Sequence, residues 1–460
     1  MKQAQTVDQS ALSAIVRGTA VTPGGDGWDR ARAAWNLTAD QHPAAVVYAE
    51  SAEDVAAVVA FAATNGLRVA AQGTGHGAGC RSSMEGLILI RTDRMTGISV
   101  DPVDRVGRFE AGVIWSDAGR AAGEHHLAVL SGSAPDVGIV GYTTGGGFGW
   151  LARRYGLACN SVRSMDVVTA DGQQRRVDAN SEADLFWALR GGGGSFAVVT
   201  AIEFDLIDLP EVFAGSVIYP ADENAGAILS AYSEWARGVT DEVTSVVRFL
   251  HAPPLPEVPE PLRDRGMITL GACYAGPAAE GQSLVEPLRH LGEPVMDLFA
   301  AMPPFELVTV HLEPDEPFPA LVSTSSLREA PEQAFDAFLE AAGPRSGSPL
   351  LAAELRQAGG RLASPPPGAG ARSHFEGEYI FLGIGVPMAP EMAHPINQHI
   401  DRICDALAPW STGGCYFNFA DRPTALESLF DAATLRRLRE VKTNYDPHDI
   451  FCGNHPIGIA

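Results

Sequence analysis

The sequence predicts an α+β protein built from more than one globular unit. The chain has 460 residues, short helix-like and strand-like segments alternate through a glycine-rich first half, and proline-rich connections appear after residue 206. At about 150 residues per domain, this length corresponds to two or three domains. A chain of this size can bury a sizeable core without further staples.

Residues 51–66 illustrate how the first half is interpreted. Ser51, Glu53 and Asp54 form a typical helix start. Apolar side chains three or four positions apart then share one face until Gly66 ends the helix. The continuous apolar run 87–91 is typical of a buried strand. Further elements are predicted as strands over 67–72 and 195–205, a helix over 181–190, and a hairpin turn at Asp171-Gly172 after 167–170.

Residues 206–409 have a different character. Glycine clusters become rare, and proline-rich connections occur at 253–256, 314–319 and 365–367. Because proline cannot donate to a strand ladder, we expect these stretches in surface loops or at sheet edges. Strands are expected over 267–274 and 379–386. We therefore predict a second domain over 206–409, between a first unit over 1–205 and a closing segment over 410–460.

Glycine is concentrated in three clusters. The first, Gly73-Thr74-Gly75-His76-Gly77-Ala78-Gly79, has glycine at every second position, and the others cover 138–149 and 191–194. Loops of this kind can turn several backbone N–H groups onto a phosphate. The first cluster is neither a nucleotide-triphosphate loop nor a Rossmann fingerprint. Three such segments together favour contact with a long ligand, such as a dinucleotide that carries a flavin.

With two C-terminal motifs, these clusters resemble the berberine-bridge-enzyme-like branch of the FAD-linked oxidases, in the vanillyl-alcohol-oxidase or para-cresol-methylhydroxylase fold group. The motifs that carry the resemblance are Gly-x-Gly-His-Gly ending at Gly77, the run from Gly145, residues 184–194, Tyr416-Phe417-Asn418-Phe419 and residues 441–447. The resemblance implies a two-part FAD-binding domain over 1–205, closed by 410–460. An inserted substrate domain would contain an antiparallel sheet covered by helices.

The resemblance also implies roles for single residues. His76 falls where the family attaches the flavin 8α-methyl carbon to a histidine. Many relatives add a second link through a cysteine, but this chain has Ala134 there, so a single link is expected. Val137 falls where a small β-branched residue leaves room for oxygen above the flavin, and Tyr142 replaces a histidine common in relatives. The expected FAD contacts are Gly73, Thr74, Gly75, Gly77, Ala78, Ala134, Gly138, Tyr142, Gly145, Gly146, Gly149, Val199 and Asn418.

Two residues are candidates for the catalytic base, which takes a proton while hydride leaves the substrate. Tyr416 could serve if a nearby cation lowered its pKa, although Phe419 replaces the second tyrosine of the family motif. Glu354, on a predicted strand, is the other candidate. Its structural alternative is an ion pair with Arg356 or Arg372.

Charge and composition exclude several functions. Thirty-three basic and 56 acidic residues give a net charge of −23 without a basic stripe, which opposes binding to nucleic acid and anionic lipid. No apolar run reaches membrane-spanning length and the start lacks a signal peptide, so we expect a cytoplasmic protein. The six cysteines lack Cys-x-x-Cys pairs and are expected as free thiols. His125-His126 and the Glu376 and Glu378 pair lack further ligands, so no metal is expected.

The expected activity is hydride transfer from a small organic molecule to covalent FAD, with oxygen as electron acceptor. The substrate would be an alcohol, an amine or an activated C–H compound of secondary metabolism, as in antibiotic biosynthesis. Because acidic groups outnumber basic ones, we expect a neutral or cationic substrate. A dehydrogenase with another acceptor and a flavin-containing binding or resistance protein are the alternatives.

Overall fold

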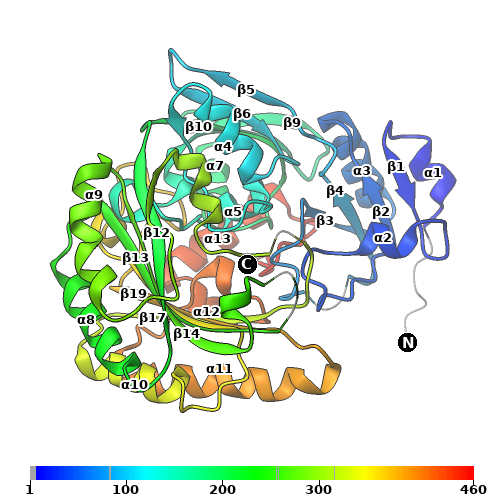
Figure 1. The fold of residues 1–460 in the computed structure, drawn as a ribbon. Helices are drawn as coiled ribbons and strands as arrows, with labels where there is room; N and C mark the ends of the chain where they lie inside the picture. The colour runs from blue at the N-terminus through cyan, green and yellow to red at the C-terminus, as the bar shows by residue number, and fades with distance from the viewer. Residues whose placement is uncertain (1–6, 82–83, 255, 257, 315, 460) are drawn as a thin grey trace.

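The computed structural model describes residues 7–81, 84–254, 256, 258–314 and 316–459. It contains three main sheets, which follow one another along the chain (Figure 1). The blue N-terminal sheet, the cyan sheet and the large green-to-yellow sheet are distinct layers in this view. The mixed α+β class is confirmed, as is the antiparallel sheet in the second half.

The first unit is a four-stranded sheet with strand order β1-β2-β4-β3, in which β4 lies parallel to both β2 and β3. Helix α3 begins after Ser51, whose side chain accepts a hydrogen bond from the Asp54 backbone N–H, and its face at 55, 58, 59 and 62 is fully buried. The bounds are α1 Gln9–Ser13, β1 Thr19–Val21, α2 Trp28–Arg32, β2 Ala45–Tyr48, α3 Ala52–Thr64, β3 Arg68–Gln72 and β4 Leu87–Arg91.

The second unit is a five-stranded antiparallel sheet with order β5-β6-β10-β8-β9. Helices α4, α7 and α13 pack on its core, which includes Trp115, Leu185 and Leu438. The bounds are β5 Ile98–Asp101, β6 Val106–Glu110, α4 Trp115–Gly123, β7 Leu127–Ala128, α5 Ile139–Thr144, α6 Ala152–Tyr155, β8 Val162–Val168, β9 Gln174–Asp178, α7 Ala183–Leu189, β10 Val198–Asp205 and β11 Ile207–Asp208.

The third unit is an eight-stranded antiparallel sheet with order β15-β12-β14-β13-β18-β19-β17, and β16 also pairs with β12. Helices α8, α10 and α11 bury one face of it against residues such as Val247, Leu355 and Phe381. The bounds are β12 Val212–Pro220, α8 Ala225–Gly238, β13 Val243–Ala252, β14 Arg265–Tyr274, α9 Ala278–Val285, β15 Met296–Asp297, β16 Ala300–Met302, β17 Leu321–Leu327, α10 Glu332–Ala342, β18 Ala352–Gln357, β19 Tyr379–Gly385 and α11 Ala393–Leu407.

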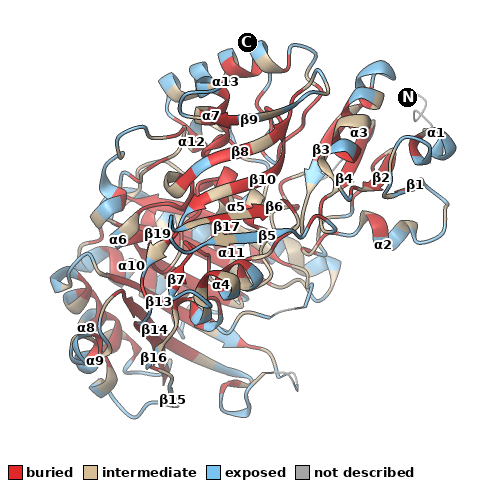
Figure 2. Cartoon of the chain, turned by 90° about the horizontal axis from the view of Figure 1, so that it is seen from above, coloured by how far each residue is buried: buried red, intermediate tan, exposed pale blue. Residues whose placement is uncertain are grey.

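The opposite face of this sheet is also covered, and it is unusually polar. Strand side chains alternate between faces, so Arg248 on β13 and Glu354 on β18, which are register partners, point away from the helices. Figure 2 shows that buried residues continue across the sheet, while the helices around it carry exposed outer faces. The polar side chains on this inner face therefore lie inside the protein.

The C-terminal segment returns to the first two units. Helices α12 (Leu426–Leu429) and α13 (Ala432–Tyr445) contribute to the core of the second sheet. The tail then pairs with β3, where the Val69 N–H donates to Ile450 O at 2.7 Å and the Cys452 N–H donates to Val69 O at 2.9 Å. No helix among the described residues is long and apolar enough to cross a membrane.

Candidate functional site

The loop after β3 has free backbone donors. The N–H groups of Gly73, Thr74, Gly75, His76 and Gly77 donate no hydrogen bond to any described residue, and Gly75 has a φ of +93°, which favours glycine. Consecutive unpaired N–H groups are the usual means by which loops bind phosphate. The loop is therefore chemically suited to an anionic ligand.

His76 is held in this loop by two partners. Trp35 stacks on its imidazole, with ring centroids 3.7 Å apart and an interplanar angle of 19°. The His76 Nε2 atom lies 3.1 Å from Asp136 Oδ1. Both carboxylate oxygens of Asp136 are buried and make no hydrogen bond to a described residue. Buried polar atoms without partners are rare in proteins, which indicates that a bound polar group belongs here.

Residues 134–144 lie opposite the loop. A Cβ atom on Gly138 would lie 3.8 Å from the Thr74 nitrogen, so the two backbones are close. The Tyr142 hydroxyl and the Thr143 Oγ1, both on α5, are buried and make no hydrogen bond to a described residue. The Tyr142 hydroxyl lies towards the second glycine cluster, since a Cβ atom at Gly149 would lie 3.1 Å from it.

Two glycines of the second cluster are required by contacts within the protein. A Cβ atom at Gly145 would lie 1.8 Å from Asn418 Oδ1, and one at Gly149 would lie 1.8 Å from Ser131 O. Any larger residue would clash with these neighbours. Close packing of chain on chain therefore accounts for these positions without a ligand.

The Tyr416 hydroxyl binds this cluster. It accepts hydrogen bonds from the N–H groups of Gly147 at 3.0 Å and Phe148 at 2.9 Å, and from Asn418 Nδ2 at 3.1 Å. The side chain is fully buried, and burial raises the pKa of Tyr416 despite the N–H donors and the charge of Arg372. Tyr416 thus holds residues 147–148 in place.

Glu354 is fully buried, and of the two ion pairs considered as its structural alternative, the one with Arg356 is present. Arg356 Nε donates to Glu354 Oε1 at 2.6 Å, and His311 Nε2 lies 3.5 Å from Oε2. Burial alone would raise the pKa of Glu354, but the Arg356 charge and the His311 contact hold it below its usual range. Glu354 is therefore ionised at neutral pH.

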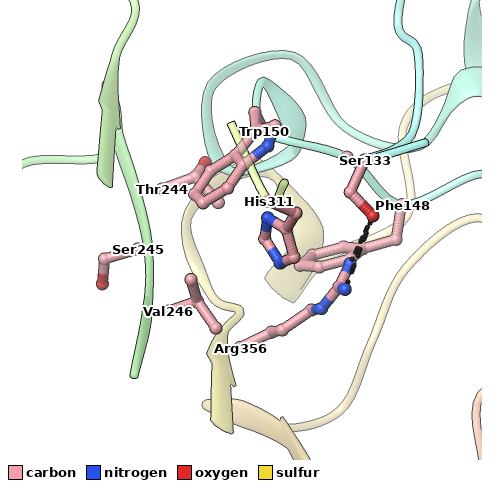
Figure 3. Close-up of a pocket in the computed structure, with 9 residues that line it drawn as sticks. Ser133, Phe148, Trp150, Thr244, Ser245, Val246, His311 and Arg356 are labelled. Atoms are coloured by element: carbon pink, nitrogen blue, oxygen red, sulfur yellow. Dashed lines mark hydrogen bonds between the residues drawn. The ribbon is translucent and has the colours of Figure 1, made fainter. Parts of the chain in front are cut away.

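A cavity opens beside these groups, between the second glycine cluster and the inner face of the large sheet (Figure 3). Phe148 comes from the cluster and Trp150 directly follows it. Val246 and Arg356 come from β13 and β18, and the His311 ring lies between Trp150 and Arg356. Ser133, Gly149, Thr244 and Ser245 complete the lining. The cavity combines apolar walls with a few polar groups, and it has room for about one water-sized molecule.

The other predicted site residues lie nearby in the second unit or in the first loop. Val137 is half-buried against the second core, Ala134 is buried, and Val199 pairs with Val167 between β10 and β8. Ala78 is buried, and its N–H donates to Gly75 O. Gly146 has a φ of +120°, and its N–H donates to Thr143 O.

Sequence reasoning missed His311, Trp35 and Asp136. His311 belongs to no recognisable motif and follows a short 3-10 helix, Pro304–Thr309. Trp35 and Asp136 meet His76 only through tertiary packing. Among the described residues, no three His, Cys, Asp or Glu side chains gather as metal ligands would.

Comparison with known proteins gives two family matches. An FAD binding domain matches residues 43–178, and a region described as berberine and berberine like matches residues 415–458. The chain is 26% identical over 446 residues to the FAD-linked oxidoreductase YgaK of Bacillus subtilis, covering 94% of this chain and 95% of that protein. It is 29% identical to (R)-6-hydroxynicotine oxidase of Paenarthrobacter nicotinovorans, covering 65% of this chain and 64% of that enzyme.

A solved structure of glucooligosaccharide oxidase from Acremonium strictum, which carries a 6-S-cysteinyl, 8α-N1-histidyl FAD, has the same fold. The TM-score is 0.82 at 23% identity, and the match covers 99% of this chain and all of that one.

These findings define the chain as an FAD-linked oxidoreductase. The chain also carries a segment, residues 415–458, that matches the berberine and berberine like family model. The residues present fit FAD: free N–H groups at 73–77 suit a pyrophosphate, and the unsatisfied carboxylate of Asp136 suits a polar ligand beside His76.

Proposed function

We propose that this enzyme is an oxygen-using oxidase with a single covalent flavin attached to His76. The observation that carries the proposal is the environment of His76, which lies among free backbone donors, stacks on Trp35 and meets an otherwise unsatisfied Asp136. When bound, FAD supplies the acceptor for a hydride from the substrate.

The fold supports a division of labour between the domains. Residues 1–205 with 410–460 would hold FAD, and residues 206–409 would cover the substrate with the inner face of the large sheet. The N–H groups of 73–77 would bind the pyrophosphate, and the 134–144 segment would bind the flavin beside His76. Ala134 has no sulfur, which supports one link rather than two.

Val137 and the named relatives support oxygen as the acceptor. Val137 is a small side chain at the edge of the proposed flavin site. (R)-6-hydroxynicotine oxidase and glucooligosaccharide oxidase are both named as oxidases. A dehydrogenase with another acceptor is the competing function.

The cavity argues for a neutral substrate with polar groups. The excess of acidic residues in the sequence predicts that anions are excluded. In the structure, however, Glu354 is paired with Arg356, and Arg248 is the register partner of Glu354 on the neighbouring strand. The acidity of the whole chain therefore does not extend to this cavity. Aromatic walls from Phe148 and Trp150 suit an apolar ring or a sugar face.

The two candidate bases differ in their surroundings. Tyr416 already accepts three hydrogen bonds, and its pKa is raised by burial. Glu354 is ionised but bound to Arg356. Both belong to the proposed machinery, Tyr416 beside the glycine cluster and Glu354 behind the cavity.

Anaerobic flavin bleaching tests the function. Maltotriose, 6-hydroxynicotine and benzyl alcohol represent a sugar, an amine and an aromatic alcohol. At least one should bleach the flavin and, in air, consume oxygen with release of hydrogen peroxide. Bleaching without oxygen consumption would identify a dehydrogenase. Binding of all three without bleaching would favour a flavin-containing binding protein.

A further inference from the structure

The cavity beside Glu354 contains a histidine that the sequence motifs do not assign. We infer that His311 is the proton acceptor of the oxidation, oriented by Glu354, an inference that rests on the proposed function. His311 lines the cavity between Trp150 and Arg356 (Figure 3). The His311 side chain is 4% exposed, so it contacts protein atoms and almost no bulk solvent.

The two ring nitrogens of His311 have different surroundings. Nε2 is buried and lies 3.5 Å from Glu354 Oε2, and neither atom has a hydrogen-bond partner among the described residues. A small shift that closes this gap lets Nε2–H donate to the carboxylate and satisfies both atoms. Nδ1, by contrast, is not fully buried, and it makes no hydrogen bond to a described residue. This tautomer therefore leaves the Nδ1 lone pair free to accept a proton.

Charged neighbours keep the ring neutral. Burial lowers the pKa of His311, and the Arg356 charge lowers it further, while Glu354 opposes both. Arg248 also faces this residue, because its Nη2 donates to His311 O at 3.1 Å and its charge lowers the same pKa. At neutral pH the imidazole is thus a base, and the Glu354 carboxylate stabilises the imidazolium that forms when it accepts a proton.

The backbone holds His311 towards the cavity at some cost. The next residue, Leu312, has a φ of +54°, a left-handed conformation that is strained for leucine. Its side chain is exposed, whereas His311 is buried. Such strain is found where surrounding contacts fix a functional side chain. Trp150 adds an edge contact to the imidazole, with ring centroids 4.8 Å apart.

The proposed step balances as a two-electron oxidation. The substrate O–H or N–H gives its proton to His311 Nδ1. The electron pair of that bond forms the C=O or C=N bond as the adjacent C–H leaves as hydride to FAD. The substrate is oxidised, the flavin is reduced, and the proton stays on an imidazolium paired with Glu354.

Nitrogen NMR of the holoprotein, with ¹⁵N in the histidine rings, tests the orientation without a substrate. The His311 signals are assigned by their loss in His311→Gln or, if that variant does not fold, in His311→Asn. We expect a neutral ring at pH 7.5 with the proton on Nε2, and a lower His311 pKa in Glu354→Gln because the carboxylate is gone. A proton on Nδ1, or a charged ring at pH 7.5, would overturn the inference.

Stopped-flow flavin reduction tests the chemistry, with whichever compound of the maltotriose, 6-hydroxynicotine and benzyl alcohol panel bleaches the flavin. His311→Gln can still donate to Glu354 but cannot accept the proton. It should reduce the flavin on the order of a hundredfold more slowly, with substrate Kd changed by no more than about threefold and the acid limb of the pH profile lost. His399→Gln is the matched control, since His399 is buried in α11 and its pKa is also lowered by burial.

Wild-type reduction rates in His311→Gln would exclude His311 as the base. A hundredfold loss in Tyr416→Phe with none in His311→Gln would assign the role to Tyr416. If no panel compound bleaches the flavin, the proposed function fails on this panel, while the NMR result still decides the orientation of His311.

Discussion

The indole of Trp35 lies flat on the imidazole of His76, with ring centroids 3.7 Å apart. Among the residues that the structure describes, the neighbouring Asp136 adds the one charged contact to this ring. The stack restricts the rotation of His76, so the imidazole is orientated before FAD binds.

Replacement of Trp35 should therefore impair flavin attachment. We expect Trp35→Ala to lower the fraction of flavin that stays with the protein after acid precipitation, because a mobile imidazole reaches the reactive geometry less often. Trp35→Phe keeps a stacking ring and should retain most of the attachment. Equal covalent fractions in the two variants would show that the stack has no part in attachment.

Removal of His76 gives the direct test of the covalent link. Acid should release no flavin from the unmodified protein and all of it from His76→Ala. Peptide mapping should find the flavin mass only on the peptide that contains His76, since Ala134 offers no sulfur. A flavin-modified cysteine peptide would contradict the single link.

The buried Lys442 is expected to be essential for stability. Its Nζ donates to Ser195 O at 2.8 Å, Phe451 O at 2.8 Å and Asp446 Oδ2 at 2.6 Å, and both charged side chains are fully buried. Lys442→Met leaves the Asp446 charge without its partner, which should cost about 3–5 kcal/mol of unfolding free energy. Denaturant unfolding measures this loss.

The matched control lies on the same helix. Arg437 pairs with Asp184 at 2.8 Å, but both side chains are largely exposed. Arg437→Met should therefore change the free energy of unfolding by less than about 1 kcal/mol. Similar losses in the two variants would contradict the importance of the buried pair.

Asp421 should make stability fall as pH rises. Burial raises the pKa of Asp421 to about 7, although Asn36 and the N–H groups of Gly79 and Cys80 oppose the shift. The folded state thus holds a proton that the unfolded state releases near pH 4, so this contribution is full below pH 4 and is lost as pH rises towards 7. Asp421→Asn does not titrate, and its Tm should exceed that of the wild type by a few degrees at pH 8 and by less at pH 5.

Asp431 provides a control of opposite sign. Its side chain accepts hydrogen bonds from the N–H groups at the start of α13, and the pKa of Asp431 is lowered, chiefly by Thr434. Asp431→Ala should cost about 1 kcal/mol at neutral pH, and the cost should shrink as the carboxyl becomes protonated in acid. If Asp421→Asn instead lowers the Tm at pH 8, as Asp431→Ala should, the assignment of Asp421 is wrong.

Local signals in the sequence predicted local structure well. The strand over Leu87–Arg91 has its predicted bounds, and the helix capped by Ser51 ends at Thr64, close to Gly66. The ion pair of Glu354 with Arg356 was one of two alternatives considered, and it forms between side chains two apart on a strand, which share a face. These features depend on residues that are near in sequence.

The contacts that define the cavity were not predictable in this way. His311 approaches Glu354, and Asp136 approaches His76, only after separate segments have packed together. Neither pair leaves a spacing pattern, and a lone histidine just before the proline-rich stretch 314–319 carries no recognisable signal. The expectation of a neutral or cationic substrate rested on composition, which averages over the whole chain and does not describe a single cavity.

The pairing of Ile450 and Cys452 with Val69 has a consequence for biosynthesis. The edge strand β3 leads directly into the loop that carries His76. Its hydrogen-bond partners in the tail are nearly four hundred residues further along the chain, so they are synthesised last. The nascent chain therefore exposes this edge of β3 for most of translation. If FAD is attached to His76 as proposed, attachment to the completed loop would follow synthesis of the tail, and truncation of the tail should lower the covalent fraction.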